Sequence, residues 1–538
     1  MQLRPMVPTR LSRPRVVVAE PFADAGLAVL RDAGIEVDSR VGRSRDELSA
    51  ALADADGLIV RSETRVDREL LAAAPRLAVV ARAGVGVDAI DVDAATAAGI
   101  VVLNTPGANT LAATEQTFAL MLALARRIPE AVAHVRAGHW DRRGLIGTEL
   151  HGKTLGIVGL GRIGGNVAAR ARAFGMTVFA RDPFISAARA DAFDAKLVGL
   201  EELLRQSDFV TLHVPLTSQT SGMIDAAKLR LMQPHAYLIN CARGGVIVER
   251  DLLAALDAGV PAGAALDVVA DEPPPPDGTG AALHRHPKVI ATPHLGGSTR
   301  EALARIATEL AHDVARVLLG APAAAAVNAP APDGADAARI VPFLDVAYRL
   351  GRFYPQYARP ERLPPFALVL GGALAGVPPE PLVRAFLSGL LQATTERRVT
   401  VVNAEAIARE LGIVVETGTD EDASSYASSL RVQAGETSVI GTVLAGSARI
   451  VELDGYEIDA MPAGAILITR HRDVPGMIGK VGTLLGDAQV NISTMQVSRN
   501  TVGGDAIMVL STDRAADETT VAALRAIPGI SAVRSLAV

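Results

Sequence analysis

The stretch Thr154-Leu155-Gly156-Ile157-Val158-Gly159-Leu160-Gly161-Arg162-Ile163-Gly164 places a glycine-rich turn between an apolar strand and an apolar-periodic helix. Each glycine of the turn has its own use in this setting. Gly159 permits a tight turn, Gly161 lets the backbone approach a pyrophosphate, and Gly164 lets helix and strand pack closely. The first helical residues, Arg162 and Ile163, offer unpaired N–H groups and the positive end of the helix dipole to phosphates. The stretch therefore predicts a dinucleotide site.

An acid at the end of the next strand supports this prediction. Asp182 lies 21 residues after Gly161. A carboxylate there accepts hydrogen bonds from the adenosine ribose and repels a 2′-phosphate, which favours NAD over NADP. The neighbouring Arg181 is the type of residue that would instead accommodate that phosphate. The alternative is an ordinary strand–turn–helix with a surface aspartate.

Short apolar strands alternate with Ala-rich helical stretches from about residue 15 to 328, which predicts parallel sheets with helices on both faces. Ala321–Gly334 is rich in Ala and Pro and predicts a linker. A second α/β unit follows, with a Gly-Gly turn at Gly371–Gly372, a helix over Leu382–Thr394 and a strand-rich end. Residues 465–538 read as strand, helix, strand, strand, helix, strand, the order of a ferredoxin-like fold. The strands predicted in the first part are Val16–Ala19, Leu58–Val60, Leu77–Ala81, Thr154–Val158, Thr177–Phe179, Phe209–His213, Tyr237–Asn240 and Val289–Ala291, and its helices are Thr114–Arg127, Ile163–Phe174, Glu249–Ala258 and Arg300–Leu319.

The composition excludes several classes of protein. A net charge of -6 over 538 residues argues against a nucleic-acid-binding protein, which would show a basic domain or stripe. No run approaches the roughly 20 apolar residues of a membrane span. The single cysteine, Cys241, excludes an intrachain disulfide framework and indicates a reducing compartment. The basic residues 1–14 lack the apolar core of a secretory signal, so we expect a disordered tail and a cytoplasmic protein.

Three polar residues follow predicted strands, at the sheet edge where open α/β folds bind ligands. Arg243 can hold a substrate carboxylate and polarise the 2-oxygen of a hydroxy acid. His294 can exchange the hydroxyl proton, and Glu272 can orient the histidine ring and stabilise its imidazolium. Taken singly, each has a simpler interpretation: a buried histidine bonded to backbone, a surface arginine, and an acid that starts a helix.

The motifs that carry these residues resemble the D-2-hydroxyacid dehydrogenase family, in the family's order over about residues 15–328. The resemblance implies that Arg243 anchors the substrate, that His294 is the acid/base with Glu272 as its partner, and that Asp267 faces the nicotinamide carboxamide. Between Glu272 and His294 the segment is longer than expected, and we expect it to loop out at the surface. The matching strings are Asn104-Thr105-Pro106-Gly107, Gly159–Gly164, Asn240-Cys241-Ala242-Arg243-Gly244-Gly245, Leu266-Asp267-Val268, Asp271-Glu272-Pro273 and Thr292-Pro293-His294-Leu295-Gly296.

The resemblance also implies the fold class, which is α/β. Two Rossmann-like, doubly wound domains are followed by an α/β intervening domain, as in the longest family members, and a ferredoxin-like ACT domain. We expect residues 15–111 and 300–328 to form the substrate-binding domain and residues 112–299 the NAD-binding domain. The intervening domain is expected at 329–460, as a spacer that communicates between its neighbours, and the ACT domain at 465–538.

The substrate side carries more positive charge than a simple hydroxy acid needs. The small-residue loop Ala83–Asp88 can grip a carboxylate through backbone N–H groups, among them those of Val85 and Gly86. Arg61 and Arg82 each end a strand beside the same cleft, and a phosphate dianion needs such pairing as it leaves water. The alternative is that both arginines are solvated charges. The segment resembles the phosphoglycerate-specific branch of the family, which implies phosphate binding by these arginines. The same resemblance adds Asn109, and a turn at Trp140 from which Arg142 reaches a partner's active site.

The tail is similar to the ACT domain, an amino-acid-binding module. His471 and Asp473 follow a strand before a helix that begins through Pro475 and Gly476. The resemblance implies that these two residues, with Asn491 of a neighbouring chain, hold L-serine. A purely dimerising role is the alternative, because the fold is widely reused.

Together the resemblances imply NAD-dependent oxidation of 3-phospho-D-glycerate to 3-phosphohydroxypyruvate, the first step of serine biosynthesis, in a serine-inhibited homotetramer. One alternative is an NAD(P)H-dependent hydroxypyruvate or glyoxylate reductase, although such relatives usually lack an ACT domain. Another is an NAD-sensing binding protein resembling the corepressors built on this scaffold. No His/Cys cluster has ligand spacing, so no metal site is expected.

Overall fold

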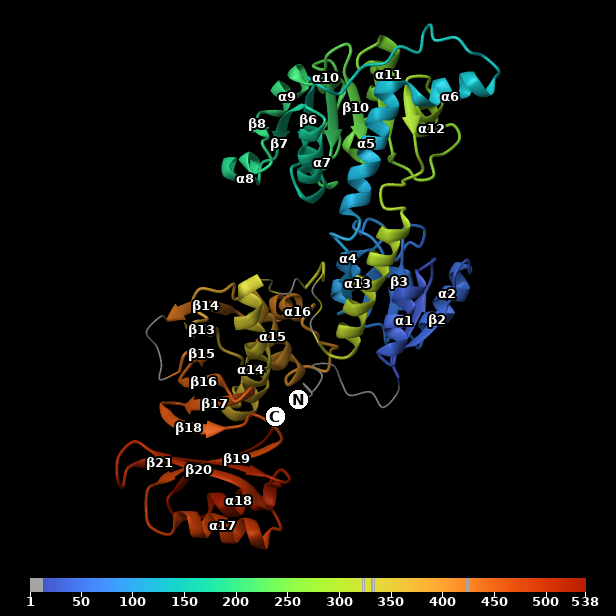
Figure 1. The fold of residues 1–538 in the computed structure, drawn as a ribbon. Coiled ribbons are helices and arrows are strands. Elements are labelled where there is room, and N and C mark those ends of the chain that lie inside the picture. The colour runs from blue at the N-terminus through green and yellow to red at the C-terminus, as the bar shows by residue number, and fades with distance from the viewer. Residues whose placement is uncertain (1–12, 322, 324, 330–331, 333, 421–425) are drawn as a thin grey trace.

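The computed structural model describes residues 13–538 except 322, 324, 330–331, 333 and 421–425. The predicted tail, residues 1–14, lies almost wholly outside the described residues. Figure 1 shows the chain arranged as successive sheet units, which we number in chain order. None of the helices within the described residues is both long and apolar enough to cross a membrane.

The first unit is a parallel sheet in the order β2-β1-β3-β4-β5. Alternate strand residues face two separate cores: Val17 and Leu58 pack against α2, α3 and α4, whereas Val16 and Ile59 pack against α13. A sheet covered on both faces needs apolar residues on both sides of each strand, which explains the continuous apolar runs. The elements are β1 (Arg15–Val18), α1 (Asp24–Asp32), β2 (Glu36–Ser39), α2 (Arg45–Leu52), β3 (Gly57–Val60), α3 (Arg68–Ala72), β4 (Val79–Arg82), α4 (Val92–Ala97), β5 (Val101–Leu103) and α13 (Arg300–Leu318).

The second unit is a parallel sheet in the order β12-β11-β10-β9-β6-β7-β8. Strands β7 and β8 lie on one side of β6, and strands β9 to β12 lie on the other. The strand order therefore reverses between β6 and β9, and ligands of open α/β sheets bind at such a point. The chain crosses between the first two units next to α5, which packs against the second unit, and next to α13, which packs against the first (Figure 1). The elements are α5 (Thr110–Arg126), α6 (Ile128–Arg136), β6 (Thr154–Val158), α7 (Arg162–Ala173), β7 (Thr177–Arg181), α8 (Ala187–Asp191), β8 (Lys196–Leu197), α9 (Leu200–Gln206), β9 (Phe209–Leu212), α10 (Ala226–Leu229), β10 (Tyr237–Asn240), the 3-10 turn η1 (Gly244–Val246), α11 (Glu249–Ala258), β11 (Gly263–Leu266), α12 (Thr279–Arg285) and β12 (Val289–Ala291).

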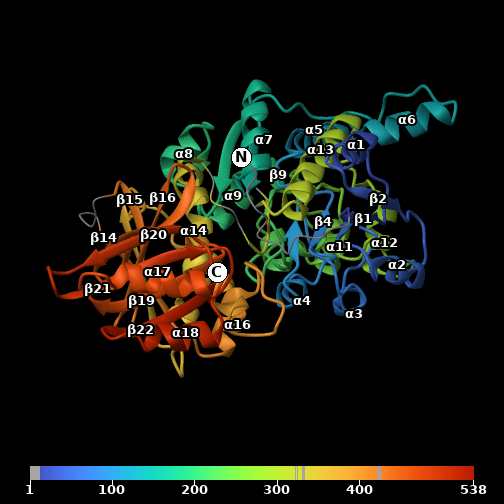
Figure 2. The same ribbon diagram turned by 90° about the horizontal axis from the view of Figure 1, so that it is seen from below.

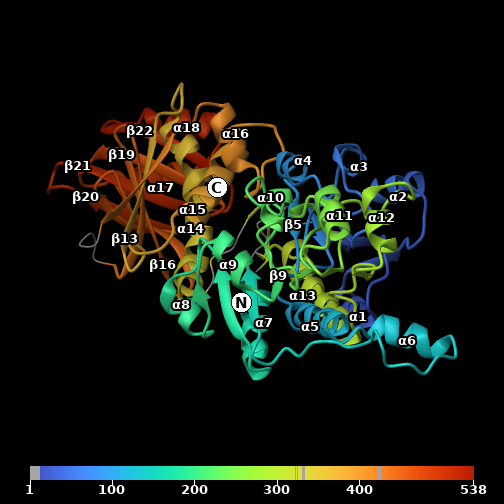
Figure 3. The same ribbon diagram turned by 90° about the horizontal axis from the view of Figure 1, so that it is seen from above.

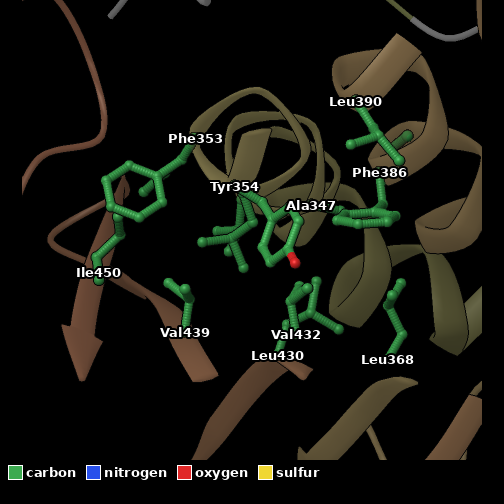
Figure 4. Close-up of a cluster of buried hydrophobic side chains, with 14 of the residues drawn as sticks. Ala347, Phe353, Tyr354, Leu368, Phe386, Leu390, Leu430, Val432, Val439 and Ile450 are labelled. Carbon is green, nitrogen blue, oxygen red and sulfur yellow. The ribbon is translucent and has the colours of Figure 1, made fainter. Parts of the chain in front are cut away.

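The third unit is a mixed sheet in the order β14-β13-β15-β16-β17-β18, with α14 and α15 packed against one face. Figure 4 shows its core, where Phe353 and Tyr354 of α14 and Phe386 of α15 meet apolar strand residues. The elements are α14 (Gly334–Ala358), β13 (Phe366–Gly372), α15 (Glu380–Gln392), α16 (Ala404–Glu410), β14 (Val415–Asp420), β15 (Ser428–Ala434), β16 (Thr437–Leu444), β17 (Ser447–Leu453) and β18 (Tyr456–Ala460).

The fourth unit has the predicted ferredoxin-like order and an antiparallel sheet, β20-β21-β19-β22. Its sheet is covered on both faces: Leu467 packs with α17 and α18, whereas Ile466 and Ile468 join the core of the third unit. The third and fourth units therefore share one continuous core. The elements are β19 (Ala465–Arg472), α17 (Met477–Asp487), β20 (Ile492–Arg499), β21 (Asp505–Thr512), α18 (Glu518–Arg525) and β22 (Ile530–Ala537).

Polar contacts join these units in series. Arg470 of β19 donates to the Tyr357 hydroxyl at 2.9 Å and pairs with Asp454, linking the fourth unit to the third. Arg398 of the third unit donates to the carbonyls of Pro75 and Leu77 in the first, at 2.9 and 2.8 Å. Figures 2 and 3, from below and above, show the third and fourth units beside the first two.

The turn predicted at Gly371–Gly372 is confirmed at the end of strand β13, because Gly372 has a left-handed φ of 62° and its carbonyl accepts from the Ala375 N–H at 2.9 Å. Two other local predictions need correction. The strand predicted at Leu77–Ala81 is shifted to Val79–Arg82, which places Arg82 in the sheet. Part of the expected linker is ordered against the first sheet, because Ala326 bridges to Leu103 and the Asn328 side chain accepts from the Val102 N–H at 2.9 Å.

Candidate active site at the junction of the first two units

The glycine turn after β6 has the geometry predicted for it. Gly159 has a φ of 96°, a left-handed conformation that favours glycine. A Cβ on Gly164 would collide with the Gly159 carbonyl, whereas one on Gly161 would meet no atom within 4 Å. The N-terminus of α7 has no side-chain cap, so its N–H groups face the open side of the turn. This arrangement fits a pyrophosphate beside Gly161 and the first residues of α7, Arg162 and Ile163.

Asp182 holds this turn from the neighbouring strand. Its carboxylate accepts from the Leu160 N–H at 2.8 Å and from the Phe184 N–H at 2.9 Å. The side chain is only half-buried. Asp182 thus fixes the turn through its bond to the Leu160 N–H, which the sequence did not predict. Its hydrogen bond to the ribose of a dinucleotide stays a prediction.

The structure brings His294 and Glu272 together. His294 Nδ1 lies 2.6 Å from Glu272 Oε2, and the two side chains are 38% and 37% exposed. A second bond, from the Val269 N–H to Glu272 Oε1 at 3.2 Å, holds the carboxylate in place. Because Nδ1 faces the carboxylate, Nε2 is left to meet a substrate, which is the arrangement that a general acid/base needs.

Asp267 fixes the backbone that carries His294. It is 1% exposed, and its carboxylate accepts from the N–H groups of Leu295 and Gly296, both at 2.8 Å, and from the Thr292 hydroxyl at 2.5 Å. These bonds support the left-handed φ of 54° at His294, a conformation that costs free energy unless its surroundings hold it. The contact of Asp267 with nicotinamide stays a prediction.

Three arginines gather at the carboxyl ends of the first sheet: Arg61 follows β3, Arg82 ends β4, and Arg243 comes from the second unit. Burial, together with the charges of Arg243 and Arg61, lowers the pKa of Arg82 to about 10. A Cβ on Gly84 would collide with the Arg82 guanidinium and one on Gly86 with that of Arg243, so the small-residue loop exists to let these cations approach. Cations held this close oppose one another, and an anionic ligand relieves that repulsion.

Arg243 also joins the two units. Its Nε donates to Asp88 Oδ2 at 3.1 Å, from the second unit to the first. Within the described chain, the N–H groups of Val85 and Gly86 donate to no protein acceptor, while the Val85 carbonyl accepts from Asn104 Nδ2 at 2.6 Å. The loop is thus held by its carbonyl and leaves N–H groups for a carboxylate.

Two residues predicted to bind substrate, Asn109 and Arg142, lie in different parts of the structure. Asn109 precedes α5, and its side-chain oxygen is buried with no partner among the described residues. Arg142 is exposed in the segment after α6, which Figure 1 shows along the end of the second unit farthest from the first. The chain's own site therefore does not include Arg142.

The predicted effector residues lie at opposite ends of the fourth sheet. His471 is buried near the end of β19, and burial lowers its pKa. Asp473 accepts from Arg499 Nη1 at 2.8 Å and from the Gly503 N–H at 3.1 Å. Asn491 precedes Ile492, which pairs through Thr512 with Ala465 at the far end of β19. One chain alone does not bring Asn491 to His471.

Sequence reasoning missed three residues of this region: Glu20, Asp88 and Gln116. The Gln116 amide donates to the Thr292 hydroxyl at 3.1 Å, beside Asp267. Their hydrogen-bond partners are distant in sequence, so local patterns could not identify them. Only Asp88 could have been noticed, because it ends the small-residue loop. For a metal, the described residues contain no group of three or more His, Cys, Asp or Glu side chains with suitable geometry.

Comparisons with known proteins match successive parts of the chain to family models. Residues 118–296 match the family model of the D-isomer specific 2-hydroxyacid dehydrogenase NAD binding domain. Residues 339–454 match the D-3-phosphoglycerate dehydrogenase intervening domain, and residues 465–529 match the ACT domain. The D-3-phosphoglycerate dehydrogenase of Synechocystis is 44% identical over 508 residues, 93% of this chain and 90% of the relative. That of Bacillus subtilis is 40% identical, over 97% and 99% of the two chains.

The chain belongs to the D-3-phosphoglycerate dehydrogenase family. Among solved structures, it is similar to the TT0316 protein of Thermus thermophilus, with a TM-score of 0.54, 38% identity, and coverage of 58% of this chain and 99% of that one. It is also similar to an Aquifex aeolicus D-lactate dehydrogenase solved with NAD and lactic acid, with a TM-score of 0.52, 29% identity, and coverage of 57% and 96%. Like its family, the chain is an NAD-dependent dehydrogenase with Rossmann-like, intervening and ACT domains.

Proposed function

We propose that this D-3-phosphoglycerate dehydrogenase family member oxidises 3-phospho-D-glycerate to 3-phosphohydroxypyruvate with NAD, the first step of serine biosynthesis. The observation that carries the proposal is the cluster of Arg61, Arg82 and Arg243 beside the small-residue loop. A substrate with a carboxylate alone needs one such cation, whereas a substrate with a phosphate as well suits all three.

In this proposal each group of the site has one task. Arg243 holds the substrate carboxylate and polarises the 2-oxygen, while Arg61 and Arg82 pair with the phosphate. His294 Nε2 takes the hydroxyl proton, and Glu272, 2.6 Å from Nδ1, stabilises the imidazolium that forms. Gly159–Gly164, Asp182 and Asp267 hold NAD, which when bound supplies the hydride acceptor.

Replacing Arg61 with Ala should lower kcat/KM for 3-phosphohydroxypyruvate, measured as NADH-dependent reduction, by at least about tenfold, because a charge-assisted contact contributes about 1.5–3 kcal/mol. Hydroxypyruvate, which lacks the phosphate, should be reduced at an unchanged rate. Arg65→Ala is the matched control, since Arg65 is an exposed arginine four residues further along the same loop. Equal rates on both substrates in the parent, untouched by Arg61→Ala, would favour a hydroxypyruvate or glyoxylate reductase. No turnover at all would favour the NAD-sensing binding protein.

We further propose that the protein works in the cytoplasm as a homo-oligomer, a homotetramer, that L-serine inhibits. Helix α6 supports association, because none of its residues is buried and Ile128, Val132 and Val135 expose an apolar face, at 50%, 41% and 52%. Trp140, four residues after α6, is 82% exposed, and the exposed Arg142 two residues later is available to a partner's site. The opposite placement of His471 and Asn491 supports a serine site shared between two chains.

L-Serine should inhibit reduction of 3-phosphohydroxypyruvate, and Asn491→Ala should raise the inhibiting concentration about tenfold while leaving the uninhibited rate unchanged, as expected for one lost polar contact to a charged ligand. The control is Asn500→Ala, an exposed asparagine of the same unit whose side chain has no bond among those described. D-Serine should have no effect. Inhibition that is equally strong in the Asn491 variant would contradict the shared site.

A further inference from the structure

Glu20 is a buried carboxylate at the edge of the first sheet that the proposed chemistry does not use. It follows β1 and is 5% exposed. Its Oε1 accepts from the N–H groups of Arg61 and Thr64, at 2.8 and 2.9 Å, and its Oε2 from those of Ser62 and Glu63, at 3.1 and 3.2 Å. Four successive backbone donors of one loop thus converge on one side chain.

The loop after β3 takes its shape from this negative charge. Four neighbouring N–H groups that point the same way need an anionic acceptor, because a loop has no neighbouring strand whose carbonyls could accept their hydrogen bonds. Burial acts to raise the pKa of Glu20, but the N–H groups of Arg61, Thr64 and Glu63 outweigh it and hold the pKa below its ordinary value. Glu20 is therefore charged at neutral pH, and the loop stays wrapped around it.

The loop that Glu20 shapes begins with Arg61. Strands β1, β3 and β4 are parallel neighbours, with Val18 opposite Ile59 and Val60 opposite Arg82, so their following loops share one edge. The charge of Glu20 also favours the charged form of the buried Arg82. Glu20 thus fixes the backbone of one arginine and offsets the charge of another.

We propose that Glu20 is a positioning residue that sets the preference of the site for phosphorylated over unphosphorylated substrate, by fixing the loop 61–64 and with it Arg61. The inference rests on the proposed function, in which Arg61 pairs with the substrate phosphate.

The test compares Glu20→Gln with the parent on 3-phosphohydroxypyruvate and on hydroxypyruvate. In the glutamine variant, the side-chain NH₂ group faces two of the four backbone N–H groups. A donor cannot accept from another donor, so the loop loses two hydrogen bonds. We expect KM for the phosphorylated substrate to rise about tenfold or more, with kcat within about twofold, and kcat/KM for hydroxypyruvate to change less than about twofold. Glu20→Asp keeps the charge and is shorter by one methylene, so it should restore part of the preference. Should the glutamine variant fail to fold, the aspartate variant alone should still show a selective rise in KM.

Asp56→Asn is the matched control. Asp56 is a second buried carboxylate of the same sheet, 2% exposed, but it accepts from the Arg15 N–H at the opposite edge. Its substitution should lower the melting temperature without changing the preference between substrates. An equal loss on both substrates in the Glu20 variants, or a loss of preference in Asp56→Asn, would reduce Glu20 to a stabilising residue. If Arg61→Ala shifts the preference and the Glu20 variants do not, the inference alone fails. If Arg61→Ala itself has no effect, the proposed phosphate site fails with it.

Discussion

Replacing His294 with Gln should lower kcat for reduction of 3-phosphohydroxypyruvate by about 10³-fold, while KM changes by less than about threefold. The reason is chemical: glutamine keeps a hydrogen-bonding side chain of similar length but cannot exchange a proton, and general acid–base catalysis contributes about 10²–10⁴-fold. Steady-state kinetics with NADH measure both quantities. Binding of NADH, followed by its fluorescence, should be unaffected, because His294 lies in a different loop from the glycine turn.

A second histidine–carboxylate pair of the same unit provides the control. His235 Nε2 lies 2.8 Å from Asp208 Oδ1, and its side chain is 62% exposed. His235→Gln should keep kcat within about twofold of the parent, because the pair is a surface contact that contributes little. A His294→Gln enzyme that retains a tenth or more of the parent kcat would remove His294 from the acid/base role.

Replacing Arg243 with Gln should lower kcat/KM by about 10²–10³-fold on both 3-phosphohydroxypyruvate and hydroxypyruvate. Both substrates carry the carboxylate and the 2-oxygen that this guanidinium is proposed to hold, and loss of two charge-assisted bonds of about 1.5–3 kcal/mol each accounts for such a decrease. Loss on both substrates separates Arg243 from Arg61, whose effect we expect on the phosphorylated substrate alone.

The control for Arg243 is Arg250→Gln, whose side chain is 84% exposed beside Asp251 in the same unit. Its kcat/KM should stay within about twofold of the parent. If the Arg243 variant loses activity on only the phosphorylated substrate, Arg243 binds the phosphate and not the carboxylate. Arg61 or Arg82 would then be left to hold the carboxylate.

Local sequence was sufficient for the parts of the site that depend on neighbouring residues. The turn Gly159–Gly164 could be predicted because tight turning, close helix packing and an open phosphate side are requirements of one short segment. The order of the fourth unit could be predicted because alternating apolar residues and turn signals repeat along the chain. The turn at Gly371–Gly372 could be predicted for the same reason, because Gly372 adopts a left-handed φ of 62° that favours glycine.

The sequence by itself determined the chemical inventory of this protein: a glycine turn for a dinucleotide, a histidine and a glutamate at strand ends, and more arginines than one carboxylate requires. Only the tertiary structure decided how that inventory is held. Glu20 meets the loop 61–64 from 41 or more residues away, and Asp88 meets Arg243 across 155. Such contacts depend on which strands lie side by side, and that order is set by packing of the whole sheet. No short stretch of sequence contains that information.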